Sequence, residues 1–160
     1  MPRTRVSSGA PWEPVVGYSR AVRAGSMVFV SGTTSVGPDG AVVGPGDPYH
    51  QTVEALSIIA RALRDAGARL EDVVRTRMFV TDISRFDEYA RAHGEIFGRI
   101  RPAATCVEVR ALVRPEFLIE IEVDAIVPAA ARRRRTPARR APTARKGLPR
   151  GGPLAGKTFR

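Results

Sequence analysis

Three carboxylates alternate along one stretch of the chain, at Glu120, Glu122 and Asp124. Residues two apart in a strand point to the same face, so this spacing predicts a row of acids on one side of a sheet. A carboxylate in such a row can position and polarise a water molecule, provided that burial keeps its pKa useful. The row needs water, cations or a partner subunit. The residues that alternate with it are apolar and should face the core: Ile119, Ile121, Val123 and Ala125.

The other reactive side chains of the chain are few. Cys106 is the single cysteine, which excludes a disulfide within the chain and a metal site of several cysteines. No histidine is near Cys106 in the sequence, so a packed side chain is favoured over a nucleophile. The two histidines, His50 and His93, have no clustered ligands beside them, and no metal site is predicted.

The elements that must position the carboxylates can be assigned from local patterns. Residues 27–32 are β-branched or aromatic and end at a glycine, which predicts a strand. Pro38, Asp39 and Gly40 predict a turn, with a short strand at 41–43 completing a hairpin. Asp47 and Pro48 predict the N-cap and first position of a helix that Gly67 ends.

The second half of the chain continues with strands and one more helix. Residues 73–80 predict a strand with one inward face (Val74, Thr76, Met78 and Val80). Asp82 or Ser84 would cap a second helix that ends at Gly98. Strands are expected at 104–109 and 117–127, each with its apolar side under the helices; for the first strand these are Thr105, Val107 and Val109. This order of strands and helices predicts an α+β fold, with two helices on one face of a mixed sheet.

Two interpretations of the acidic sheet face remain open. It can face solvent, with Arg75 and Arg77 pairing with Glu120 or Glu122 across strands. Alternatively, a second copy of the chain covers it and a pocket forms at the seam. Phe29 and Phe79 lie on the same side and favour association.

Charge divides the chain into two parts. The 160 residues are 43% apolar, enough for one domain with a core, and carry a formal net charge of +10. Residues 130–160 hold eleven Lys and Arg and no acid, whereas residues 1–129 have a net charge of −1. We expect a flexible segment at 1–14, a domain at 15–128 and a disordered basic tail at 129–160. The tail, from 132 to 160, could contact nucleic acid weakly through charge.

Targeting segments are not evident in the sequence. The basic start has no apolar stretch behind it, so a signal peptide is not predicted. No apolar run approaches the ~20 residues that a membrane-spanning helix needs. A cytoplasmic protein without membrane contact is the expectation.

Four blocks of the sequence together resemble the RidA/YjgF family, also called the endoribonuclease L-PSP family. They are YSRAVRAGSMVFVSG at 18–32, LEDVVRTRMFVTD at 70–82, RPAATCVEV at 101–109 and LIEIE at 118–122. The resemblance covers about residues 15–127, and it implies a chorismate-mutase-like fold assembled as a homotrimer with a cleft at each subunit interface. The resemblance thereby favours the second interpretation, in which another copy of the chain covers the acidic sheet face.

The resemblance also implies an activity and a set of residues. Members hydrolyse reactive enamines and imines, such as 2-aminoacrylate, to 2-keto acids and ammonia, without cofactor or metal. Glu120 would be the catalytic carboxylate, with Glu122 as the fallback because the preceding loop leaves the alignment open. The matching substrate-binding positions are Tyr18, Ser31, Gly32, Thr105 and Cys106.

One position departs from the family pattern in a way that bears on the substrate. Deaminating members carry Pro-x-Arg-Ser/Thr, whose Arg forks onto the substrate carboxylate; here that position is Ala104. Arg101 has the wrong strand parity and Arg110 lies about 20 Å away along the strand, which leaves Arg75, Arg77 or an arginine of a neighbouring subunit as open alternatives. Losing the anchor should cost on the order of 2–5 kcal/mol of binding. Arg20 stands where members have Gln, and it would put at the cleft entrance a cation that those members lack, which could be the compensating charge.

These observations favour a hydrolase or deaminase of an imine, enamine or related intermediate, with simple 2-imino acids disfavoured. Two alternatives stay open. One is a trimer that binds a metabolite without catalysis. The other is an RNA-directed protein that uses the basic tail.

Overall fold

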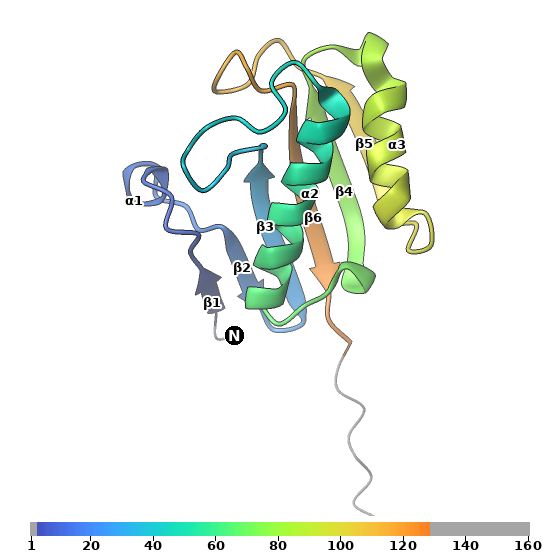
Figure 1. Ribbon diagram of the computed structural model, residues 1–160. Coiled ribbons are helices and arrows are strands. Elements are labelled where there is room, and N and C mark those ends of the chain that lie inside the picture. The colour runs from blue at the N-terminus through green and yellow to red at the C-terminus, as the bar shows by residue number, and fades with distance from the viewer. Residues whose placement is uncertain (1–2, 129–160) are drawn as a thin grey trace, which may run out of the picture.

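The computed structural model describes residues 3–128, which form a six-stranded sheet with helices on one side (Figure 1). The strand order is β1-β2-β3-β6-β4-β5. Neighbouring strands are antiparallel except for the parallel pair β4 and β5, so the sheet is mixed. The strands are β1 (Arg3–Val6), β2 (Ala21–Ala24), β3 (Met27–Thr33), β4 (Val73–Val80), β5 (Ala103–Glu108) and β6 (Ile119–Ile126).

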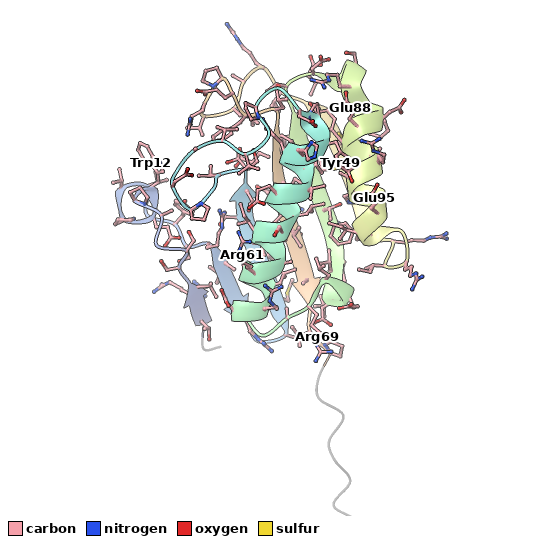
Figure 2. All side chains as sticks on the ribbon, viewed as in Figure 1. Trp12, Tyr49, Arg61, Arg69, Glu88 and Glu95 are labelled. Atoms are coloured by element: carbon pink, nitrogen blue, oxygen red, sulfur yellow. The ribbon has the colours of Figure 1, made fainter. Side chains whose placement is uncertain are left out.

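Two long helices, α2 (Pro48–Asp65) and α3 (Phe86–Phe97), lie side by side on the same face of the sheet (Figure 1). A short helix, α1 (Trp12–Val16), precedes β2, and 3₁₀ turns at Leu70–Asp72 and Ile83–Arg85 precede β4 and α3. Tyr49 and Glu95 join the long helices through a hydrogen bond of 2.8 Å (Figure 2). The expected α+β architecture is confirmed.

The core lies between the two helices and the sheet. Leu56, Ile59 and Leu63 recur at helical spacing on α2 and are fully buried. They are part of the same apolar cluster as Ile119, Ile121 and Val123, the inward residues of β6. The predicted alternation along β6 is therefore confirmed, because the acids between these residues remain partly exposed.

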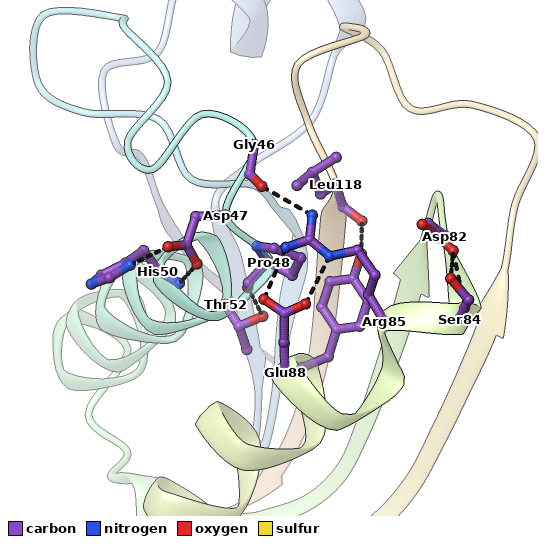
Figure 3. A network of polar contacts seen from close by, with 11 residues as sticks. Gly46, Asp47, Pro48, His50, Thr52, Asp82, Ser84, Arg85, Glu88 and Leu118 are labelled. Atoms are coloured by element: carbon purple, nitrogen blue, oxygen red, sulfur yellow. Dashed lines mark hydrogen bonds and ion pairs between the residues drawn. The ribbon is translucent and has the colours of Figure 1, made fainter.

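The ends of the helices follow the expected local chemistry (Figure 3). The Asp47 side chain accepts a hydrogen bond from the His50 backbone N–H at 3.0 Å, and Gly67 adopts a φ of 73° just after α2. Asp82 caps the 3₁₀ turn before α3 by accepting from the Ser84 N–H. Arg85 donates to both Glu88 oxygens and to the Gly46 carbonyl, which ties α3 to the loop before α2.

Two strand predictions need correction. Residues 41–43 do not form a strand; the hairpin is reduced to a single bridge between Val36 and Val42. In β4, Val73 is buried and Val74 is exposed, the reverse of the expectation for Val74. The register between β4 and β6 shifts between Val73 and Arg75, and such an irregularity moves a side chain to the other face.

The orientation of β5 was also predicted wrongly. Ala104, Cys106 and Glu108 lie opposite Thr76, Met78 and Val80, so they share the helix-covered face. Thr105 and Val107 are on the other side and exposed. The expectation assumed that the more apolar side of the strand faces the helices. This assumption fails because β5 is an edge strand, whose inner face is only partly covered and need not be apolar.

Within residues 1–14, the segment expected to be flexible, strand β1 occupies Arg3–Val6 and helix α1 begins at Trp12. β1 pairs with β2 along its full length, and Val6 is buried. The Glu13 carboxylate accepts hydrogen bonds from the Ser7 and Ser8 hydroxyls and the Ser8 N–H at 2.5–2.8 Å, which holds the segment together. The predicted basic tail, 129–160, lies outside the described residues.

Among residues 3–128, no helix combines the length and apolarity that crossing a membrane requires.

Candidate functional site

Glu120 and Gly32 meet on the sheet face opposite α2 and α3, which we call the open face. A Cβ placed on Gly32 would overlap the Glu120 carboxylate, whose Cδ would lie 2.8 Å away. Gly32 sits where the pairing of β3 with β6 is interrupted, between Val30 and Thr33. Because residue 32 has no side chain, the Glu120 carboxylate can rest directly on the β3 backbone.

Arg20, the residue just before β2, extends its side chain to Gly32. Its Nη2 donates a hydrogen bond of 2.6 Å to the Gly32 carbonyl, and its own carbonyl accepts from the Ser31 N–H at 3.1 Å. The guanidinium carbon lies 5.8 Å from the centre of the Tyr18 ring. Tyr18, Arg20, Gly32 and Glu120 therefore gather at one end of the open face.

The Ser31 hydroxyl is already engaged with the backbone. It donates to the Ser19 carbonyl at 2.8 Å, and Thr33 Oγ1 donates to the Ser31 carbonyl at 2.7 Å. These bonds stabilise the turn of backbone that carries Gly32. Ser31 thus contributes geometry at this end of the sheet rather than a free hydroxyl.

The three acids of β6 have different surroundings. Arg77 donates to Glu122 at 2.8 Å and to Asp124 at 3.1 Å, so these two carboxylates are paired. Glu120 has no hydrogen-bond or ion-pair partner in the described part of the chain. Burial raises the pKa of Glu120, the negative charge of Glu122 raises it further, and Arg20 acts in the opposite direction.

Thr105 and Cys106 lie away from this cluster within one chain. β5 is separated from β3 by β6 and β4, which is about 14 Å at the usual strand spacing. Thr105 lies beside Arg77 on the open face, whereas Cys106 lies beside Met78 on the helix-covered face. Burial raises the pKa of the Cys106 thiol, which disfavours the nucleophilic thiolate.

Ala104 occupies an exposed position on β5 beside Thr76. Thr76 Oγ1 lies 3.0 Å from His93 Nε2, a contact that the sequence analysis did not anticipate. Burial lowers the pKa of His93, so the neutral imidazole is favoured. At position 104, where the family pattern has an arginine, this chain therefore has the small apolar Ala104, and the nearby His93 ring is neutral.

Within residues 3–128, no group of three or more His, Cys, Asp and Glu is arranged to hold a metal ion. A surface hollow beside Arg64, Leu70 and Val127 lies at the far end of β6 from Glu120 and contains none of the predicted site residues.

The contact between Arg20 and the Gly32 carbonyl is the feature that sequence reasoning missed. Arg20 and Gly32 are twelve residues apart, and Glu120 is much further along the chain. One partial signal is present in the sequence: Tyr18 and Arg20 are two residues apart, and in an extended chain such residues share a face. The interruption in β3 that brings Gly32 to Glu120 has no sequence signature of its own.

The fold and this cluster define a class: a two-layer α+β domain whose open sheet face carries a carboxylate without a partner in residues 3–128, beside a glycine and a half-buried arginine. The family model described as Endoribonuclease L-PSP matches residues 8–127. The chain belongs to this family, which is the RidA/YjgF family.

Individual relatives agree with this assignment. An uncharacterized Streptomyces coelicolor protein is 40% identical over 121 residues, covering 76% of this chain and 90% of that protein. A RutC family protein of Pyrococcus abyssi is 34% identical over 110 residues, covering 69% and 86%. The crystal structure of Rv2704, a YjgF/YER057c/UK114 family member from Mycobacterium tuberculosis, is 52% identical with a TM-score of 0.72, covering 79% of this chain and all of that one.

Proposed function

We propose that the protein is a cofactor-independent hydrolase of small imines or enamines, acting in the cytoplasm as a homotrimer with Glu120 as the catalytic carboxylate. The observation that carries this proposal is the state of Glu120. Its carboxylate rests on Gly32, has no partner in the described chain, and has a raised pKa because of burial. Glu122, the other candidate, is already paired with Arg77.

A site made by two chains accounts for the separation of the predicted residues. Thr105 and Cys106 lie on β5, an edge strand whose outer backbone has no partner strand in the described sheet. Unpaired edges and exposed apolar side chains favour association. Phe29 and Val107 on the open face are both about two-fifths exposed. A second copy can therefore bring its β5 to the Glu120 end of the first copy.

The proposed chemistry uses Glu120 to handle protons. The ionised carboxylate accepts a proton from water as the water oxygen bonds to the imine carbon. That proton passes to the nitrogen, which gives a carbinolamine. Glu120 then takes the hydroxyl proton and delivers it to the nitrogen as the carbon–nitrogen bond breaks, so that ammonia leaves and the ketone forms. A base with a pKa nearer neutrality than an ordinary carboxylate performs both transfers better.

The substrate preference follows from Ala104. Because residue 104 is alanine, the protein offers no arginine fork there to the carboxylate of a simple 2-imino acid. That carboxylate must be held elsewhere or bound weakly. Arg77 is committed to Glu122 and Asp124 and is not available as a substitute. We therefore propose that 2-aminoacrylate is a poor substrate unless a cation outside position 104 holds its carboxylate.

The central experiment compares wild type with Glu120→Gln on an enzymatically generated imine, measuring ammonia release. Loss of the base should reduce the rate about 10²- to 10⁴-fold. Glu54→Gln, on the outer surface of α2, is the matched control and should retain the wild-type rate. Equal rates for Glu120→Gln and wild type would contradict the catalytic role of Glu120.

The second experiment restores the family arginine. Ala104→Arg should increase hydrolysis of 2-aminoacrylate relative to wild type, because it supplies the missing carboxylate fork. Strong wild-type activity on 2-aminoacrylate would show that another group holds the carboxylate. No hydrolysis of any imine by either protein, with small-molecule binding retained, would favour a metabolite-binding trimer without catalysis.

An RNA-directed role is the second candidate, favoured by the endoribonuclease description of the family model and the eleven basic residues of 130–160. Deleting 130–160 should abolish RNA binding measured by gel shift and leave imine hydrolysis unchanged. Glu120→Gln should have the opposite pattern. A change in small-molecule turnover on deletion of the tail would contradict the separation of the two parts.

A further inference from the structure

Arg20 has more hydrogen-bond donors than the described chain uses. A guanidinium carries five N–H groups, and the single hydrogen bond that the Arg20 side chain makes within residues 3–128 goes from Nη2 to the Gly32 carbonyl. Its Nε is fully buried and has no partner in that part of the chain. Nη1 makes no hydrogen bond there either, although it is not buried.

The charge of Arg20 is likewise uncompensated at close range. Neither Glu13 nor Glu120 forms an ion pair with it, although both contribute to the electrostatic field that it experiences. Glu13 is occupied by the Ser7 and Ser8 hydroxyls. Burial is the largest influence on the guanidinium and lowers its pKa. Keeping a half-buried arginine without a close anion is costly, so the site is suited to receive one.

The position of Arg20 relative to Glu120 determines what that anion could be. Arg20 contacts the Gly32 carbonyl, and the Glu120 carboxylate lies against the same residue. A group bound at Nη1 would therefore lie close to the carboxylate that handles protons. The Tyr18 ring lies 5.8 Å from the guanidinium carbon, so an aromatic face is also close to a group bound by Arg20.

We propose that Arg20 is the anion-anchoring residue of the site and holds the carboxylate or an equivalent oxyanion of the substrate. The anion is held from the β2–β3 side of the cleft rather than from position 104 on β5. This inference rests on the proposed function for the reaction, but the anion-binding step stands on the Arg20 geometry alone.

The first test uses the wild-type protein and requires no catalysis. Pyruvate, the smallest 2-keto acid product, and its neutral isostere pyruvamide are titrated while the ¹⁵Nε–H signal of Arg20 is followed by NMR. Pyruvate should shift this signal to saturation, and pyruvamide should leave it within the spread of the other arginines. No shift with pyruvate, or equal shifts with both compounds, would overturn the proposal.

The second test measures pyruvate affinity by calorimetry in three variants. Arg20→Gln should weaken binding at least tenfold, whereas Arg20→Lys, which keeps the charge, should lose less. Arg61→Gln removes the same charge from the surface of α2 and should bind as wild type. Unchanged affinity in a folded Arg20→Gln protein would overturn the proposal. If Arg20→Gln does not fold, the wild-type titration decides.

The two proposals can fail separately. Pyruvate binding at Arg20 without imine hydrolysis would overturn the enzymatic function and leave the anion site standing. Imine hydrolysis with the same kcat and KM in wild type and Arg20→Gln would leave the enzyme standing and overturn the role of Arg20. A rise in KM for anionic but not for neutral imines in Arg20→Gln would support both.

Discussion

The two faces of β6 are made from alternate residues of one eight-residue strand, yet they have different physical roles. Ile119, Ile121 and Val123 are fully buried beneath α2. Glu120, Glu122 and Asp124 remain partly exposed on the open face. The first face is completed within the chain, because two amphipathic helices cover it (Figure 1). The second face has side chains that the described chain does not cover.

This difference separates folding from function. Substitutions on the helix-covered face remove packing and should act on stability. Substitutions on the open face change charges or contacts that matter mainly when a ligand or a second copy is present. Glu120 and Arg77 show the contrast within the open face itself, since one lacks a partner in residues 3–128 and the other is held by two carboxylates.

The largest expected effect is on the covered face. Ile121→Ala leaves a cavity between β6 and the helices, and similar core truncations cost about 2–5 kcal/mol. Urea unfolding followed by circular dichroism would measure the loss. A free energy of unfolding within about 0.5 kcal/mol of wild type, the range of an ordinary surface substitution, would contradict the assignment of this face as the core.

A smaller effect, on activity, is expected at the junction of Gly32 with Glu120. Gly32→Ala puts a methyl group where the carboxylate now rests, so the Glu120 side chain must move and imine hydrolysis should fall at least tenfold. Gly94→Ala is the matched control, since a Cβ there meets open space within helix α3. It should keep full activity and gain up to about 1 kcal/mol of stability. Equal activities for the two variants would contradict the proposed position of Glu120.

Association should depend on the open face and not on the helix side. Phe29 is 41% exposed on the open face and Phe86 is 44% exposed on α3, which makes them a matched pair. Phe29→Glu should weaken self-association at least tenfold, as measured by sedimentation velocity across a concentration series. Phe86→Glu should leave it unchanged. If Phe86→Glu dissociates the assembly and Phe29→Glu does not, the interface lies on the other side.

The smallest expected effect is a change in pH dependence. Hydrolysis requires ionised Glu120, so the rate should fall as pH decreases through its raised pKa. Glu122→Gln removes a negative charge that raises this pKa, and the acidic limb of the kcat profile should move to lower pH. Asp124→Asn, which also disrupts the Arg77 pair, should not move it. A limb that moves to higher pH in Glu122→Gln would contradict the prediction.

The same raised pKa has a consequence for stability. A carboxyl group whose pKa is higher in the folded chain binds its proton more tightly there, so its contribution to stability is complete at low pH. That contribution is lost as pH rises through the folded pKa of Glu120. Glu120→Gln should therefore unfold at a slightly higher temperature than wild type at neutral pH, and at nearly the same temperature in acid.

Much of the fold was predictable because its signals are local. Asp47 and Pro48 mark the start of α2, and Gly67 follows its end, through the backbone geometry that these residue types favour. The alternation along β6 identified both faces correctly. Prediction was wrong at Val74 and on β5, where an irregular pairing and an edge position changed which side of the strand is covered. Neither feature leaves a periodic signal in the sequence.

For this protein, the sequence alone determined the elements, the row of acids on β6 and the family resemblance, because each depends on residue types at short spacing. The tertiary structure decided which acid has a partner and where the cation lies. Arg77 pairs with Glu122 and Asp124 because β4 and β6 are neighbours. Arg20 meets Gly32, and Gly32 meets Glu120, because β2, β3 and β6 are adjacent in the sheet, although β6 is distant along the chain from the other two strands. Such contacts depend on strand order and register, which local residue preferences do not encode.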